Sequence, residues 1–333
     1  MTATPVGRAR SIIGASSPDD DVIQPSQHAD RYAREAPDLA RILRSSSVEV
    51  SAHAYEHKDA DALAAQALFV RAARRARVAV FVTAVAAGLV LAAGGLAPLL
   101  DSAVSSSLLV VFALLGVAGG VVASYWIRRI REGGLLERWM TRRAEAETER
   151  LRYFDLVTKG TPSESPILQL EYFRRYQHDV QRAYYRRRAS HHEAGADRAL
   201  AGSSAGMAAA GAATGVAGIF GATLDPAVAA LAAIGLIGQA WATGLENGEA
   251  THQHRRNSER YRRTVHALDG LHAMLDRVRE AVAAGETEAL HAYVDAVHDQ
   301  LSLEHRQWLE ETATASHAVA RLVALLESYR GGG

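Results

Sequence analysis

The stretch that decides the fold is LLDSAVSSSLL, residues 99–109, where Asp101 is the only charged residue within residues 78–127. It is flanked by two apolar sequences, VAVFVTAVAAGLVLAAGGLAP at 78–98 and SSSLLVVFALLGVAGGVVASYW at 105–126. A helix needs about 20 apolar residues to cross the hydrocarbon core of a bilayer, and both sequences reach that length. A carboxylate inside a span is costly, whereas one at a turn is solvated. We therefore predict a helical hairpin that crosses a membrane twice and places Asp101 in water between its spans.

The same arrangement returns later in the chain, where Asp225 is the only charged residue within residues 199–245. Here we predict spans at 199–220 and 226–245, joined by a turn that contains Thr223, Asp225 and Pro226. This second run consists mostly of Ala and Gly, so its hydropathy is lower. A buried helical hairpin of a soluble domain is the alternative for this run.

Arginines flank both predicted hairpins, and neither short turn contains Lys or Arg. By the positive-inside rule, both chain termini and all long segments lie in the cytoplasm, as in a multi-pass protein of the inner membrane. Tyr125 and Trp126 end the second span, and Trp241 ends the fourth, where an aromatic belt is expected. The flanking arginines are Arg71, Arg74, Arg75, Arg77, Arg128, Arg129, Arg131, Arg186, Arg187, Arg188, Arg198, Arg255, Arg256, Arg260, Arg262 and Arg263.

The remaining sequence reads as helix without a persuasive strand, so the fold class is an all-α membrane protein with a cytoplasmic helical bundle. Residues 59–77 run into the first span without Gly or Pro, which predicts one continuous helix. Apolar residues recur at helical spacing in 170–184, 261–278 and 290–326, which is typical of helices that pack on one another.

We predict a duplicated plan with two modules. Residues 1–45 are polar at their start and rich in Pro, Ser and Asp, so they are expected to form a disordered tail. The first two-span module occupies 46–158, KGTPSESP at 159–166 is a linker, and the second two-span module occupies 167–333.

Four short sequences resemble the SLATT superfamily, the bacterial two-span modules associated with nucleotide-second-messenger synthases (SMODS) and nucleotide-sensing (SLOG) domains. They are DALAAQ at 61–66, LEYFRRYQ at 170–177, RRNSERYRR at 255–263 and EHRQW at 304–308. The resemblance covers about 50–158 and 167–310 and is similar to two variants fused in tandem. It implies a membrane effector of bacterial conflict and anti-phage systems, which opens a pore or disrupts the membrane when a signal nucleotide appears.

Small residues four positions apart recur in the predicted spans, and such spacing allows close approach of helices in lipid. They either assemble an oligomeric pore or pack the hairpins of one monomer. These candidate packing residues are Gly116, Gly120, Gly202, Gly206, Gly211 and Gly215. Polar residues of the spans either line an aqueous path or bond to the helix backbone. They are Thr83, Ser124, Ser203, Ser204, Thr214 and Gln239.

The sequence predicts no catalytic, cofactor-binding or metal-ligating residues. The sequence GSSAG at 202–206 matches G-x-S-x-G, but a nucleophile elbow needs a strand before it, and a helix is predicted here. His252, His254 and the pair at 191–192 lack the i, i+4 spacing of helical metal ligands, and the chain contains no cysteine. The arginines and aromatics of 173–192 favour anionic lipid over nucleic acid, because the segment leads directly into a predicted span. A third interpretation is that one of the arginine clusters binds a phosphorylated messenger.

We therefore expect a homo-oligomeric membrane effector that permeabilises the bilayer, with a nucleotide-sensing or nucleotidyltransferase protein as partner. The alternative is a passive membrane scaffold that gathers cytoplasmic partners through a helix at 286–328. An all-helical pattern without a base and nucleophile argues against an enzyme.

Overall fold

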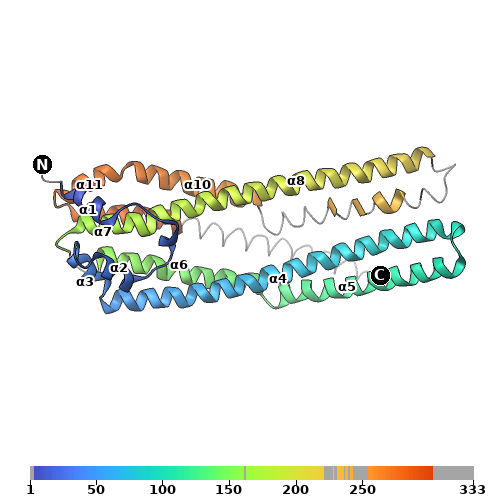
Figure 1. The fold of residues 1–333 in the computed structure, drawn as a ribbon, viewed down its shortest axis with the longest axis horizontal. Helices are drawn as coiled ribbons and strands as arrows, with labels where there is room; N and C mark the ends of the chain where they lie inside the picture. The colour runs from blue at the N-terminus through green and yellow to red at the C-terminus, as the bar shows by residue number, and fades with distance from the viewer. Residues whose placement is uncertain are drawn as a thin grey trace, which may run out of the picture. The chain divides into compact units, whose positions relative to one another are not determined.

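The computed structural model describes residues 4–160, 163–220 and 254–302, together with individual residues between 228 and 242. All regular secondary structure within these residues is helical, which confirms the all-α prediction (Figure 1). The predicted turn at Thr223, Asp225 and Pro226 and the residues beyond 302 lie outside the described part of the chain.

The helices follow one another with short connections. Four short ones come first: α1 (Pro5–Ile13), η1 (Pro18–Asp21), α2 (Pro25–Tyr32) and α3 (Pro37–Leu43). The chain then forms α4 (Ser46–Leu96), η2 (Ala97–Leu99), α5 (Ser102–Glu132) and α6 (Leu135–Lys159). After the linker come α7 (Pro166–Phe173), the π-helical turn η3 (Arg174–Asp179) and α8 (Val180–Phe220). The last are α10 (His254–Ala273), α11 (Leu275–Ala283) and helical residues 287–302.

The prediction of a disordered tail over residues 1–45 is wrong for the part that the structure describes. Proline occupies the first turn of α1, α2 and α3, where its fixed φ and missing N–H suit a helix start. Apolar residues of these helices, among them Ile13, Tyr32 and Leu39, are almost fully buried. The polar composition of the segment concealed a small number of well-placed apolar anchors.

The predicted tandem modules are not the compact units of the structure. One unit consists of residues 1–62, 140–188 and 260–333, and the other of residues 63–139 and 189–259. Each unit takes segments from both halves of the sequence.

The first unit has an aromatic core around α7 and η3. Its largest fully buried side chains include Tyr153, Phe154, Tyr172, Phe173 and Tyr176. The predicted apolar stripe of residues 170–184 is thus confirmed as core as far as Val180, whereas Tyr184 is only half-buried. Helix α7 is buried on all sides, since its polar residues Gln169 and Glu171 are buried as well.

The second unit contains the first predicted hairpin, formed by the second half of α4 and by α5. The two helices run antiparallel, because Arg75 contacts Trp126 while Ala86 contacts Gly116 (Figure 1). The prediction of one helix from the polar segment into the first span is confirmed, since α4 is continuous from Ser46 to Leu96. The hairpin ends at Gly133 and Gly134, and Gly134 adopts a φ of 53° that suits glycine.

Candidate functional site: an apolar hairpin and its arginine groove

Helices α4 and α5 are the two helices, among the described residues, that are long and apolar enough to cross a membrane. Only 22% of the most apolar window of α4 and 11% of that of α5 is buried within the protein. Exposed apolar side chains on α5 include Val110, Leu114, Val117 and Val121, each more than half exposed. Soluble proteins rarely expose a contiguous apolar surface of this kind, whereas hydrocarbon would accept it without cost.

The turn of this hairpin contains Asp101, as predicted. Its carboxylate accepts a hydrogen bond from the backbone N–H of Ala103 at 2.8 Å and so caps the first turn of α5. The residue is exposed, which fits a position in water beyond the ends of the two apolar helices. The one charge of residues 78–127 thus stabilises a helix end rather than interrupting a span.

The closest approach between α4 and α5 occurs at a glycine next to the predicted ones. A Cβ atom at Gly119 would lie 2.6 Å from Thr83 Oγ1 and 3.2 Å from the Thr83 backbone nitrogen. At Gly116 the nearest atom is Ala86 Cβ at 3.6 Å, and at Gly120 nothing lies within 4 Å. Gly116 therefore packs within the monomer, whereas the face at Gly120 is open.

The second predicted hairpin shows the same division. A Cβ atom added at Gly206 of α8 would lie 2.7 Å from the backbone oxygen of Gly238 and 3.1 Å from the Cβ atom of Ala242. At Gly211 and Gly215, no described residue lies within 4 Å of an added Cβ. Gly202 is half-buried on the same helix. Gly88 of α4 contacts Ile237, so the described residues between 233 and 242 contact both α4 and α8.

The predicted pore-lining residues that the structure describes differ in exposure. The Thr83 hydroxyl donates a hydrogen bond to the Ala79 carbonyl at 2.9 Å, which is the backbone bond expected of a threonine in a span. Ser203 is buried, whereas Ser124 and Ser204 are exposed. The side chain of Thr214 and all of Gln239 lie outside the described residues.

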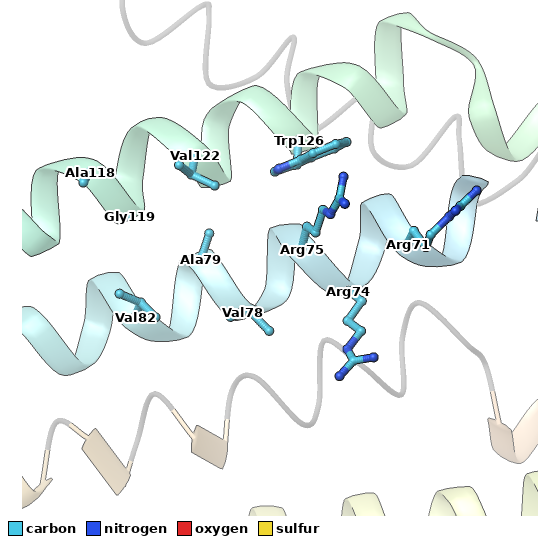
Figure 2. Close-up of a pocket in the computed structure, with 10 residues that line it drawn as sticks. All are labelled: Arg71, Arg74, Arg75, Val78, Ala79, Val82, Ala118, Gly119, Val122 and Trp126. Carbon is cyan, nitrogen blue, oxygen red and sulfur yellow. The ribbon is translucent and has the colours of Figure 1, made fainter. Parts of the chain in front are cut away.

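A groove of about 700 Å³ lies between α4 and α5 at the end of the hairpin remote from Asp101. One end of it is cationic and the other is apolar. Figure 2 shows that Trp126 lies over the guanidinium group of Arg75, while Arg74 extends from α4 away from α5. The lining residues are Arg71, Arg74, Arg75, Val78, Ala79, Val82, Ala118, Gly119, Val122 and Trp126.

The arginines of this groove are held by groups that leave their charge uncompensated. The Arg75 Cζ lies 4.7 Å from the centroid of the Trp126 ring, a cation–π contact. The Arg71 Nε donates to the Ala67 carbonyl at 3.0 Å. No carboxylate within the described residues forms an ion pair with Arg71, Arg74 or Arg75. The groove therefore presents net positive charge at its rim.

The first unit contains a buried ionic cluster that the sequence did not indicate. Glu171, which is fully buried, accepts hydrogen bonds from Arg279 Nε at 2.5 Å and from Arg174 Nε at 2.6 Å. Arg174 also donates to Asp179 and to the Gly14 carbonyl, each at 2.6 Å. The cluster thus links η3 to α11 and to the end of α1.

The neighbouring Arg175 fastens the amino-terminal segment in the same way. Its guanidinium donates to the Asp20 carboxylate, at 2.8 Å from Nε, and to the Ile13 carbonyl at the end of α1. A cation at a helix carboxyl end is favourable, because the last carbonyls are unpaired and the helix dipole is negative there. The π-helical turn brings Arg174 and Arg175 to this position, and such turns are frequent at functional sites.

His178 lies in the same turn and is held as a neutral imidazole. Its Nε2 donates to the Leu268 carbonyl at 3.1 Å, since a carbonyl only accepts, and its Nδ1 accepts from the Tyr293 hydroxyl at 2.6 Å. Burial, reinforced by the nearby His272, lowers the pKa of His178 to about 4. Burial likewise lowers the pKa of His28 to about 4, with a contribution from Arg31.

The structure also locates the serine and histidine motifs that the sequence analysis weighed for catalysis and metal binding. Gly202–Gly206 lies within α8, so its serines are helical. His192 and His254 do come together, with their Nδ1 atoms 2.9 Å apart, although they are distant in sequence. No group of three or more metal-ligating side chains occurs among the residues that the structure describes.

Sequence reasoning missed Glu171, Arg279 and the role of Arg174. It assigned the arginines of 173–192 to the membrane surface, whereas Arg174 and Arg175 contact buried carboxylates. The sequence signal was present but ambiguous, because a charged residue on the apolar face of a helix does not show which distant residue compensates it.

Comparison with models of protein families, with curated proteins and with solved structures gives no match.

Proposed function

We propose that this chain is an effector that permeabilises the inner membrane, with four spans, both termini in the cytoplasm and a homo-oligomeric active form. The observation that carries the proposal is the α4–α5 hairpin, whose apolar side chains remain largely exposed. Its charged residues are at the turn and at the arginine end, and α4 and α5 have the length that a bilayer requires.

The second pair of spans, 199–220 and 226–245, is part of the proposal. Contacts of Gly206 with Gly238, and of Gly88 with Ile237, support a bundle in which both hairpins pack through small residues. Close approach of this type replaces apolar burial as the driving force for helix association in lipid. The open positions Gly120, Gly211 and Gly215 then supply faces for contact between copies of the chain.

Coupling between the first unit, here called the polar unit, and the second, here called the apolar unit, supports an effector rather than an anchor. Helix α4 has residues in both units without interruption, and so does α8. A rearrangement of the polar unit would therefore be transmitted along rigid helices into the hairpins. The resemblance of residues 61–66 and 170–177 to the SLATT superfamily supports the same function and suggests a nucleotide-sensing or nucleotidyltransferase protein as the source of the trigger.

The membrane topology has a direct test, since the chain contains no cysteine. Single cysteines replace Ser102 at the turn and Thr141 in α6, both of which are exposed. In intact spheroplasts, a membrane-impermeant maleimide is expected to label S102C and to label T141C only after the membrane is permeabilised. Labelling of both or of neither in intact cells would refute the topology.

Permeabilisation is tested by dye release from liposomes that contain the purified full-length chain. Leakage is expected to rise more steeply than linearly with the protein-to-lipid ratio, because several copies form each pore. A scaffold would release no dye at any ratio. The double variant G211L/G215L should abolish leakage while keeping the helical content, because no described residue lies within 4 Å of a Cβ added at either position.

The matched control is G270L. Gly270 is also open, with nothing within 4 Å of a notional Cβ, but it lies on α10 in the polar unit. It should leak like the wild type. Equal loss of leakage in G270L would show that added bulk alone inactivates the protein, and leakage by G211L/G215L would refute assembly through this face.

A further inference from the structure

We propose that the groove between α4 and α5 is a binding site for one anionic phospholipid of the cytoplasmic leaflet. Its phosphate is bound by Arg71 and Arg75, and one acyl chain lies along Val78, Val82 and Val122. The inference rests on the membrane location proposed above and goes beyond it, because general attraction to a bilayer requires no such site.

The polarity of the groove matches the depth profile of a lipid. Arg71, Arg74 and Arg75 lie on the polar side of Val78, at the point where the apolar part of α4 begins. Val82 lies seven residues beyond Arg75, about 10 Å deeper at 1.5 Å per residue. An amphiphile with an anionic head and an apolar tail therefore meets complementary groups along its whole length, whereas a soluble anion would leave the apolar part empty.

The cationic end has the geometry for a phosphate. Positions 71 and 75 lie one turn apart on α4, and guanidinium groups donate paired hydrogen bonds to phosphate oxygens. The stacking of Arg75 against Trp126 orients one guanidinium and leaves its N–H edge available (Figure 2). The absence of a carboxylate partner among the described residues means that a bound anion would displace no existing ion pair.

The close approach of the helices shapes the apolar end. Gly119 allows α5 to contact α4 at Thr83, so the two helices meet closely at the apolar end of the groove. A basic pocket between helices at the cytoplasmic side is the arrangement by which membrane proteins recognise lipid headgroups.

Trp126 is a natural reporter of this site. A variant in which Trp139, Trp241 and Trp308 are replaced by phenylalanine retains Trp126 alone. The full-length variant is placed in phosphatidylcholine nanodiscs, and either dibrominated phosphatidylglycerol or dibrominated phosphatidylcholine is added at increasing mole fraction. Half-maximal quenching of Trp126 should need a mole fraction of phosphatidylglycerol at least about tenfold lower than that of phosphatidylcholine. Each arginine that binds the phosphate is expected to contribute a factor of about five to this preference.

The test variant is R71Q/R75Q, which should reduce the preference for phosphatidylglycerol to about twofold or less. The variant R71K/R75K keeps the charge without the planar donors. Its preference for phosphatidylglycerol is expected to lie between that of the wild type and that of R71Q/R75Q. The matched control is R129Q/R131Q, which removes the same charge at the end of α5 outside the groove and should keep the preference. Far-UV circular dichroism of each variant establishes that the helices are retained.

Each result has a defined meaning. Equal quenching by both lipids would overturn the lipid site but leave the proposed function standing. The same holds if R71Q/R75Q and R129Q/R131Q lose the preference for phosphatidylglycerol equally. Reversal of quenching by millimolar inorganic phosphate would overturn the choice of a lipid, because a headgroup without an acyl chain would then suffice. Quenching by neither lipid would overturn the membrane location itself.

Discussion

Replacing Glu171 by glutamine tests whether the buried ionic cluster holds the polar unit together. Glu171 is fully buried and accepts hydrogen bonds from Arg279 and Arg174, whose side chains are only 9% and 10% exposed. The variant E171Q keeps the size of the side chain but removes its charge. It also turns an amide donor toward guanidinium groups that can only donate.

The cost can be worked out from what remains around the two arginines. Arg174 keeps Asp179 and the Gly14 carbonyl, but Arg279 keeps only the exposed Asp276. Removing one member of a buried ion pair costs about 3–5 kcal/mol, because an uncompensated charge stays buried. At about 2–4 °C per kcal/mol for a domain of this size, the melting temperature of the polar unit should fall by about 6–20 °C.

The assay is thermal unfolding of the full-length protein in detergent, with hydrogen exchange measured in α7 and α11. The control is D276N, which removes the other carboxylate bound to Arg279 at a position that is 81% exposed. D276N should unfold like the wild type. A melting temperature for E171Q within 2 °C of the wild type, or equal effects of the two variants, would refute the idea that this cluster stabilises the unit.

Three further results are expected. G119A should destabilise the hairpin by about 1–3 kcal/mol, because its Cβ would meet Thr83. G120A should be neutral or stabilising by about 0.5–1 kcal/mol, because its Cβ would meet no described residue. Equal denaturant midpoints of the two variants would contradict this expectation. Burial lowers the pKa of His28 and His178 from 6.5 to about 4 in the folded protein. Between these two pH values the unfolded chain therefore binds more protons than the folded one. Stability should therefore be complete above about pH 6.5 and fall by up to about 3 kcal/mol per histidine toward pH 4, as read by circular dichroism melts. H178Q should flatten this dependence, and an unchanged slope would show that other groups cause it.

The apolar hairpin illustrates what local sequence can predict. Its length, its single charge and its arginine flanks are properties of consecutive residues, so α4 and α5 could be placed from composition and spacing alone. The continuous helix into the first span and the break at Gly133 and Gly134 followed in the same way, because helix propensity acts over a few neighbouring residues.

The glycines show where local pattern stops being sufficient. The spacing of Gly116 and Gly120 indicated a packing face, but the tightest contact is at Gly119, with Thr83 opposite. A repeat of small residues shows where close approach is allowed, and only the partner helix decides which of them it uses.

The amino-terminal segment was mispredicted for a related reason. Its polar composition is typical of disorder, yet Ile13, Tyr32 and Leu39 are buried, and Arg174 and Arg175 bind the end of α1. Those two arginines lie about 160 residues away along the chain, so no window of neighbouring sequence contains both partners.

By itself, then, the amino-acid sequence determined that the chain is helical and that residues 78–126 form a neutral, membrane-length hairpin with its acid at the turn. Helix formation and transfer into hydrocarbon depend on the composition of contiguous residues. Only the tertiary structure decided that the two halves interleave into a polar and an apolar unit, that Glu171 is enclosed by Arg174 and Arg279, and that three arginines border a groove against Trp126. Those outcomes depend on which distant segments pack together, and the energy of a buried charge or a helix contact is set by the partner rather than by its neighbours in sequence.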